Sequence, residues 1–378
     1  MKIGYNKKTL MKKALFLGLL FLAFFSVSGI AQAQTSGEET VTAVSTMKAQ
    51  VVNIVSQRME NVPDTNLKEN YQVIQAEVLD GDKAGNIVTV DNDYYSLTKG
   101  EIFYMTYTPA GLAGGTDSYS VDEPYRLPQV MVLVGLFVLV LFIFGGWQGV
   151  RGLASLIGSF ALIIFVLLPG ILRGYSPILV TLGISSLIIV IGSYITHGFN
   201  KTTTSAVLGM IATVAITGAL AAWAVHFTYL TGFSTEEAVS LNLGTSGSIN
   251  MLGLLLGGIM IGLLGVLYDV AISQAIAVEE LKTASPDMPK RKLFERAIRI
   301  GREHIGALVN TLAIAYVGVA LPLLLLFYIL QTGNIAYMVN KEIFSAEIVR
   351  IMIGSIGLIL AVPITTLVSV WILTRKKN

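Results

Sequence analysis

The chain has 378 residues, of which 53% are hydrophobic and only 13% charged. Soluble domains carry about 25% charged residues, so this composition excludes an ordinary soluble protein and predicts an integral membrane protein. Without cysteine, the chain can form neither disulfides nor thiolate sites. The net charge of +2 conceals a division: residues 34–127 carry 14 acids and 6 bases, whereas the remainder carries 10 acids and 20 bases.

The N-terminus has the pattern of a targeting segment. Residues 1–13 contain five lysines, an apolar run follows from Ala14 to Val27, and small residues then end at Ala31-Gln32-Ala33. This order of basic, apolar and small residues is typical of a secretory signal peptide, and the apolar run is short for a spanning helix. We therefore interpret residues 1–33 as a signal peptide. The alternative is an uncleaved signal anchor, and both interpretations place the following residues outside the cell.

Residues 34–127 predict a small exported β domain. Residues 35–47 are rich in Ser, Thr and Glu and suggest a flexible lead, and Lys48 to Arg58 suggests a short helix. Alternating apolar residues then predict strands at 71–79, 86–90, 101–108 and 118–125, separated by Gly- and Asp-containing turns. The predicted architecture is a small barrel or sandwich, and its acidic surface is interpreted as ordinary solvation.

Residues 128–378 predict an all-α polytopic bundle of about seven transmembrane helices. The apolar runs cover residues 127–144, 153–172, 178–196, 206–229, 249–281, 305–330 and 348–373, with Pro322 and Pro363 inside the last two. Each run is long enough to cross about 30 Å of hydrocarbon. Pro322 and Pro363 are expected to kink or break their helices.

Loop charges predict the orientation. With residues 34–127 outside, the inner loops hold Arg151, Lys201 and seven bases between residues 282 and 302, and the C-terminal bases are also inside. This agrees with the positive-inside rule and with the signal peptide. We expect a multi-pass protein of the bacterial plasma membrane with a cytoplasmic C-terminus.

The stretch 253–281 carries the candidate site. Asp269 is the first carboxylate on what the sequence predicts to be a continuous membrane helix, and Ser273 and Gln274 follow it. Ionisable groups in membrane helices are functional-site candidates because the bilayer penalises charge. We expect Asp269 to carry a proton, with Arg302, Asn310 or Thr311 as partners. The alternative is a helix-end Asp that is wetted or bonded to a neighbouring helix. Earlier in the stretch lie glycines at helix-packing spacing: Gly253, Gly257, Gly258, Gly262 and Gly265.

The basic segment after Pro289 predicts an amphipathic helix near residues 290–304. Its apolar residues fall on one face and its bases mostly on the other. We expect the apolar face in lipid and the bases on anionic lipid head groups. The bases abut a membrane span, and the aromatic residue among them, Phe294, falls on the apolar face. Nucleic acid is therefore not an expected partner. A homo-oligomer or a partner membrane protein remains open.

The sequence offers no enzyme or cofactor signature. It contains no P-loop, no G-x-S-x-G and no H-E-x-x-H motif, and its three histidines are scattered. We therefore expect no catalytic residue, no metal site and no cofactor.

Several blocks resemble the YibE/F family of bacterial membrane proteins, namely 265–281, 299–305, 308–312 and 315–327. The resemblance extends from about Tyr71 to the C-terminus and implies a multi-span inner-membrane protein without an established activity. One position departs from it, because family members often have two acids at 268–269 and this chain has Tyr268. The layout of the last three spans is similar to that of SecDF and RND-type membrane domains. Together these features favour a transport-related, proton-coupled function, and the alternative is a non-transporting scaffold or assembly factor that docks partners through the exported domain.

Overall fold

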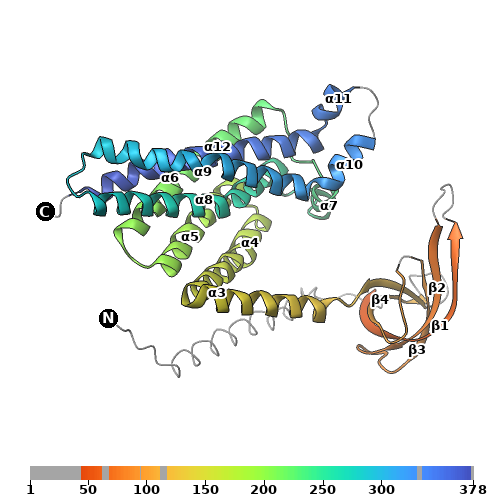
Figure 1. Ribbon diagram of the computed structural model, residues 1–378. Helices are drawn as coiled ribbons and strands as arrows, with labels where there is room; N and C mark the ends of the chain where they lie inside the picture. Colours follow the sequence, from red (N-terminus) through yellow and green to blue (C-terminus); the bar gives the residue numbers. More distant parts are fainter. Residues whose placement is uncertain (1–43, 62–67, 94, 111–116, 330–333, 376–378) are drawn as a thin grey trace, which may run out of the picture. The chain divides into compact units, whose positions relative to one another are not determined.

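A computed structural model describes residues 44–61, 68–93, 95–110, 117–329 and 334–375. The chain divides into two compact units, one up to Val134 and one from Gly135 onward (Figure 1). Because their relative placement is not determined, each unit is described by itself. The signal peptide expected at residues 1–33 lies outside the described residues, as does most of the expected lead.

The first unit is a closed five-stranded barrel. It is built from β1 (Ser45–Asn61), β2 (Lys68–Val78), β3 (Ile87–Asn92), β4 (Ile102–Thr108) and β5 (Ser118–Pro124). The order around the barrel is β1-β2-β3-β5-β4. β1 pairs antiparallel with both β2 and β4, and β3 runs parallel to β5 where Asp91 pairs with Ser120. This is the topology of an OB-type barrel.

The barrel confirms the four predicted strands and corrects the segment before them. The short helix predicted at Lys48 to Arg58 is wrong, because that segment lies within β1. Met47, Ala49 and Val51 alternate along β1, and all three are buried in the barrel core. This period of two is the pattern of a strand, and pairing partners on both sides of β1 make the extended form favourable.

The helix that leads from the first unit into the second reverses direction. α3 (Leu127–Leu162) contains a break at Gly146, which has a φ of 52° and a ψ of −138°. A Cβ built on Gly149 would lie 2.6 Å from the carbonyl oxygen of Leu141. Residues eight apart in a straight helix are separated by about 12 Å, so the chain folds back at Gly146. A π-helical turn (Ile163–Leu167) and α4 (Leu168–Leu172) continue the second arm.

Eight further helices complete the described part of this unit. They are α5 (Pro177–His197), α6 (Lys201–Phe227), α7 (Glu236–Gly244), α8 (Met251–Ala284), α9 (Lys290–Val319), α10 (Leu321–Ile329) and α11 (Ile335–Asn340), followed by α12 (Glu342–Leu373). α7 begins at the Thr235 cap, whose side chain accepts a hydrogen bond from the Ala238 N–H.

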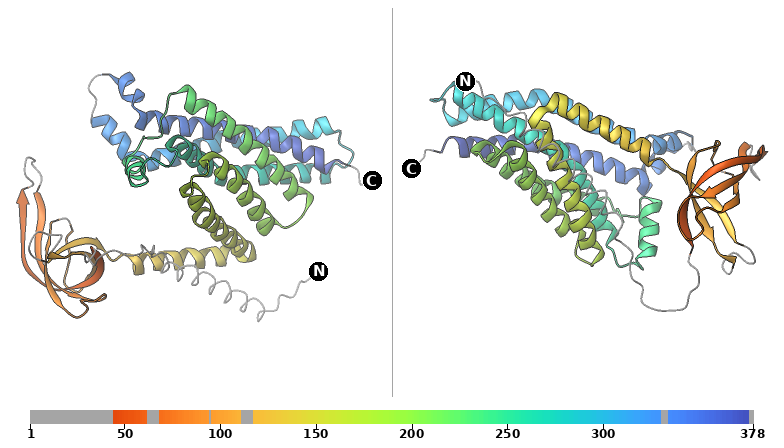
Figure 2. Two further views of the ribbon diagram at one scale, coloured as in Figure 1. Left: turned by 180° about the vertical axis from the view of Figure 1, so that it is seen from behind. Right: turned by 90° about the horizontal axis from the view of Figure 1, so that it is seen from below.

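α8 is the central helix of the bundle. It packs against α5, α6, α9 and α12 (Figures 1 and 2). Leu263, Leu267 and Ala271 of α8 are buried against Met210 of α6 and Leu358 of α12. These side chains belong to one apolar core cluster that joins the three helices.

The structure has fewer helices that could each cross a membrane than the seven predicted. Among the described residues, five helical stretches are long and apolar enough to cross a membrane, and a sixth results if α9 and α10 are counted together. α9 and α10 are bent by 67° at a break beside Pro322, which is the break expected there, whereas Pro363 lies inside an uninterrupted α12. The stretch Leu127–Leu172 counts once in this tally. Seven spans require the reversal at Gly146 to divide that stretch, and this stays a prediction.

The basic segment differs from its expected form. It is helical and amphipathic, but it is the first half of the continuous helix α9. Leu293 and Ala297 are fully buried against Val278 of α8 and Val370 of α12. The expectation that this apolar face lies in lipid is wrong, because the extended ends of α8 and α12 cover it.

Candidate functional site

One face of α8 is left uncovered by its neighbours. Gly258, Gly262, Gly265, Asp269 and Ser273 recur every three or four residues, so they form one stripe along the helix, and all five are exposed. The rest of this helix carries the apolar residues that pack against the surrounding helices. Asp269 therefore lies on the open face of the helix that holds the bundle together.

The glycines of this helix fall into two groups. A Cβ on Gly257 would lie 2.7 Å from Thr181 Oγ1, and one on Gly262 would lie 2.7 Å from the Tyr316 hydroxyl. With Gly253, which is close to Pro177, these glycines permit close helix approach. Gly258 and Gly265 have nothing within 4 Å of an added Cβ. Close packing does not explain those two glycines.

A small hollow of about 170 Å³ brings together three of the predicted site residues. It is lined by Asp269, Ser273 and Gln274 of α8, with His304 and Gly301 of α9 completing much of its wall. The carboxylate, the hydroxyl and the imidazole are each exposed. The hollow thus offers an acid, a hydroxyl and a titratable base on two facing helices.

Gln274 holds together the three helices around this small hollow. Its Nε2 donates to the Ala297 carbonyl and to Thr366 Oγ1, both at 2.8 Å, so that it ties α8 to α9 and α12. A Cβ on Gly301 would lie 2.4 Å from Val362 Cγ1 and 2.8 Å from Gln274 Oε1. The glycine at 301 is therefore required for the helices to close around the buried amide.

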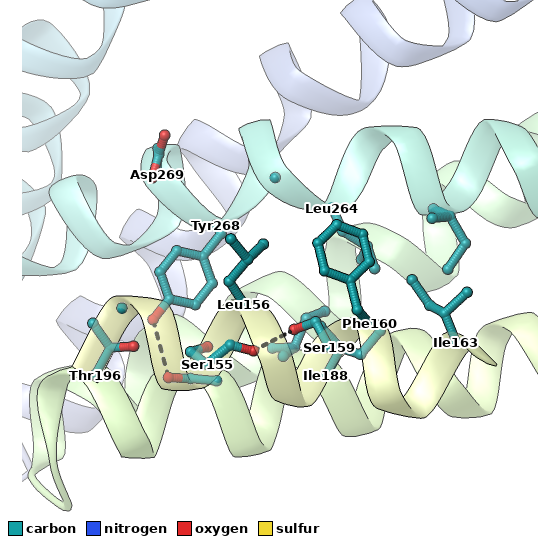
Figure 3. A pocket seen from close by; sticks show the side chains of 15 residues that line it. Ser155, Leu156, Ser159, Phe160, Ile163, Ile188, Thr196, Leu264, Tyr268 and Asp269 are labelled. Atoms are coloured by element: carbon teal, nitrogen blue, oxygen red, sulfur yellow. Dashed lines mark hydrogen bonds between the residues drawn. The ribbon is translucent and has the colours of Figure 1, made fainter. Parts of the chain in front are cut away.

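A large hollow of about 420 Å³ lies on the other side of Asp269, between α3, α5 and α8 (Figure 3). Its walls are mostly apolar, from Leu156, Phe160, Ile163, Ile188, Ile261 and Leu264. Hydroxyl groups are interspersed among them, from Ser155, Ser159, Thr196 and Tyr268. The hollow combines an apolar body with a few hydrogen-bonding groups, as small-molecule sites do.

Tyr268 closes one end of the large hollow. Its hydroxyl donates to the Gly192 carbonyl of α5 at 3.3 Å, and its ring lies 6.0 Å from that of His197. Beyond it, an end hollow of about 200 Å³ is lined by His197, Glu279 and polar residues at the start of α6. Tyr268 therefore separates two hollows that follow each other along the same side of α8.

Asp269 lines both the small and the large hollow. Among the described residues it makes no hydrogen bond and no ion pair, and its carboxylate points away from the large hollow in Figure 3. An unpaired carboxylate on a membrane helix is costly unless water, a proton or a cation compensates it. Because it has no protein partner among the described residues, the Asp269 carboxylate is free to bind water, a proton or a cation.

The other predicted site residues lie elsewhere. Arg302 is exposed and outside the lining of the small hollow. Asn310 is nine residues after Gly301, which places it on the opposite side of α9, and it too is exposed. Thr311 donates to the Ala307 carbonyl of its own helix at 2.9 Å. The structure thus places none of the three expected partners on Asp269.

Two residues of the site were not in the predicted set. His304 faces Asp269 across the small hollow, and Tyr268 forms the end wall of the large one. The sequence signal for His304 was its position three residues after Gly301, which faces α8. No group of three or more potential metal ligands occurs in the described part of the chain.

The fold and composition define an integral membrane protein with several long apolar helices. A family model described as YibE/F-like protein matches residues 133–375. The chain therefore belongs to the YibE/F-like family, as its sequence blocks indicated. Comparison with curated proteins and with solved structures gave no match.

Proposed function

We propose that this protein is a proton-coupled, transport-related protein of the bacterial plasma membrane, with residues 34–127 outside and the C-terminus cytoplasmic. The observation that supports the proposal is the position of Asp269, unpaired on the open face of α8 and shared by two hollows. Asp269 lies 18 residues after Met251, which is about 27 Å along the helix. In the proposed orientation this is the inner edge of the hydrocarbon.

The chemistry of the small hollow fits reversible protonation. A charged Asp269 favours water and a cation in the hollow, whereas a protonated one lowers the cost of contact with lipid or an apolar substrate. His304 on the facing wall can relay the proton to the cytoplasmic surface. Ser273, one turn along α8, can donate a hydrogen bond to the charged carboxylate.

A scaffold or assembly factor is the competing function. It is favoured by the buried apolar residues at the centre of the bundle, such as Leu263 and Leu267. The separately folded barrel would then serve as the docking module for a partner membrane protein. The two functions differ in whether Asp269 carries protons.

Proteoliposomes loaded with a pH-sensitive dye test the proposal. A pH gradient is imposed, and proton flux is recorded with an amphiphilic cation, an amphiphilic anion and a neutral amphiphile in turn. We expect at least one probe to raise the flux, and Asp269→Asn to remove that rise. Asp287→Asn, an exposed acid of the α8–α9 turn, is the matched control and should retain it. A flux that persists in Asp269→Asn, or no probe-dependent flux at all, would favour the scaffold.

A further inference from the structure

The shape of the large hollow indicates the kind of molecule it accommodates. About 420 Å³ of space lies between three helices, with aliphatic and aromatic walls such as Leu156, Phe160 and Leu264. A strictly hydrophilic solute would lose most of its hydration there and gain only a few hydrogen bonds in return. The body of a ligand in this hollow must therefore be apolar.

A glycine of α8 adds space to the large hollow. Gly265 lines the hollow, is exposed, and has nothing within 4 Å of an added Cβ. Gly258, two turns earlier on the same open stripe, also has free space around it but does not line the hollow. The lack of a side chain at 265 thus contributes space to the hollow itself, whereas the lack of one at 258 does not.

The charge of the lining is one-sided. Asp269 is the acid among the residues that line the large hollow, and these residues include no lysine or arginine. The nearest base in the sequence, Arg151, precedes the lining residue Gly152 and lies outside the lining. Electrostatic complementarity therefore favours a cation over an anion.

The Asp269 carboxylate can reach a ligand in this hollow. It is exposed and, within the described residues, nothing bonds to it. The carboxylate points away from the hollow in Figure 3, but Asp269 is one of the residues that line the hollow. A change of one side-chain rotamer redirects the carboxylate, and no hydrogen bond has to break for this.

We propose that the large hollow binds an amphiphilic cation, with its apolar body among the walls of α3, α5 and α8 and its positive charge at Asp269. This names the substrate class of the proposed transport site, and so it rests on the proposed function. Tyr268 forms the end of the site nearest the end hollow.

Two ions of nearly the same shape and opposite charge test the proposal. Full-length protein is placed in phosphatidylcholine nanodiscs, and equilibrium binding of tetraphenylphosphonium and of tetraphenylborate is measured, with empty nanodiscs subtracted. We expect saturable binding of tetraphenylphosphonium, weakened at least tenfold by Asp269→Asn. Tetraphenylborate should show no saturable binding. Equal saturable binding of both ions, or of the cation to wild type and Asp269→Asn, would overturn the proposal.

A pair of glycine variants locates the bound ion. Gly265→Leu should weaken tetraphenylphosphonium binding at least tenfold by filling the hollow, while Gly258→Leu should bind as the wild type does. Both changes replace a glycine on an exposed helix face, where leucine is the better helix former, so both variants should fold. Equal binding by the two variants would place the ion elsewhere and refute the site.

The binding and flux experiments separate the two proposals. If tetraphenylphosphonium binds as described but no probe drives proton flux, the binding site is real and the transport function is refuted. If only a neutral or anionic probe drives flux that depends on Asp269, transport stands and the amphiphilic cation is refuted.

Discussion

At the residue scale, Gly301 is a position of the bundle where an added side chain would meet its neighbours at close range. Gly301→Ala would bring a Cβ to 2.4 Å from Val362 Cγ1, so that the helices around Gln274 must separate. Overpacking of this kind costs about 1–3 kcal/mol. We expect a lower melting temperature for the purified protein in detergent.

Gly306→Ala on the same helix provides the control for that change. Nothing lies within 4 Å of a Cβ at Gly306, and alanine is the better helix former by roughly 1 kcal/mol. Its melting temperature should equal or exceed that of the wild type. A melting temperature for Gly301→Ala that matches the Gly306→Ala value would contradict the close packing around Gln274.

A second prediction at this scale concerns an ion pair in the barrel. Lys83 Nζ lies 2.7 Å from Asp117 Oδ2 and 3.7 Å from the centre of the Tyr107 ring. The hydrogen bond to Lys83 lowers the pKa of the Asp117 carboxyl, and the same bond raises the pKa of Lys83. The pair links the turn after β2 to the start of β5.

The pH dependence follows from the direction of these shifts. A carboxyl whose folded pKa is lowered stabilises the fold above its unfolded pKa of about 3.9, and this stabilisation is lost as the pH falls through the folded pKa. The barrel should therefore loosen below about pH 4, as measured by hydrogen exchange of β4 and β5 peptides in the full-length protein. Asp117→Asn should reduce this dependence on acid, and the neighbouring exposed Asp82→Asn should leave it unchanged.

The sequence predicts which residues belong to the site better than it predicts which residues they contact. Asp269, Ser273 and Gln274 could be chosen from sequence because a polar residue on an apolar helix is a strong local signal. Their partners could not, because helix spacing fixes which face a residue occupies but not which helix lies opposite. Gln274 illustrates this: its bonds to Ala297 and Thr366 join segments that are far apart in sequence.

At the element scale, α6 and α12 form an antiparallel pair in fixed register. Small residues recur every four positions on α6, at Ser205, Gly209, Thr213 and Thr217, and on α12, at Gly357, Ala361, Thr365 and Ser369. Ser205 Oγ lies 2.9 Å from Ser369 Oγ. A Cβ on Gly209 would lie 2.7 Å from Thr365 Oγ1, and one on Gly357 would lie 2.7 Å from Thr217 Cγ2. These contacts fix one alignment along four turns.

The register can be tested by cross-linking, because the natural chain has no cysteine. The double variant Ser205→Cys with Ser369→Cys should form a disulfide under mild oxidation, since the two hydroxyls it replaces are already in contact. The pair Ser205→Cys with Thr365→Cys is displaced by one helical turn, about 5.4 Å, and should not. Cross-linking is read by the gel mobility of the protein after cleavage between the two helices. Efficient cross-linking of the displaced pair alone would show a different register.

The sequence predicted elements well where the apolar residues recur with a clear period. The prediction failed where contacts with a distant segment determine the conformation. The strands after Tyr71 showed a clear period of two and were found. The polar residues of Lys48 to Arg58 hide the alternation and favour a helix in the sequence, whereas the pairing of β1 with two neighbours makes the segment a strand. Likewise, the basic face of residues 290–304 indicates a surface helix, but Leu293 is buried against Val370 of α12, which lies much later in the chain.

At the scale of the whole molecule, the number and direction of spans depend on one position. Gly146 has a backbone conformation that residues with side chains rarely adopt, and the close approach of Gly149 to the Leu141 carbonyl shows that the chain reverses there. The sequence marked this position only as a short loop between two apolar runs. If the segments before and after Gly146 both cross the membrane, Tyr175 lies on the outer side and Phe199 on the inner side.

Cysteine labelling determines that order. Tyr175 and Phe199 are both exposed residues in the connections before and after α5, and the chain offers no other thiol. In intact cells, a membrane-impermeant maleimide should label Tyr175→Cys, because two crossings within Leu127–Leu172 return the chain to the outside. Phe199→Cys should be labelled only after permeabilisation, since α5 carries it inward. If Leu127–Leu172 crosses only once, the two results exchange, and Asp269 then lies near the outer surface, where a cytoplasmic proton could not reach it through His304.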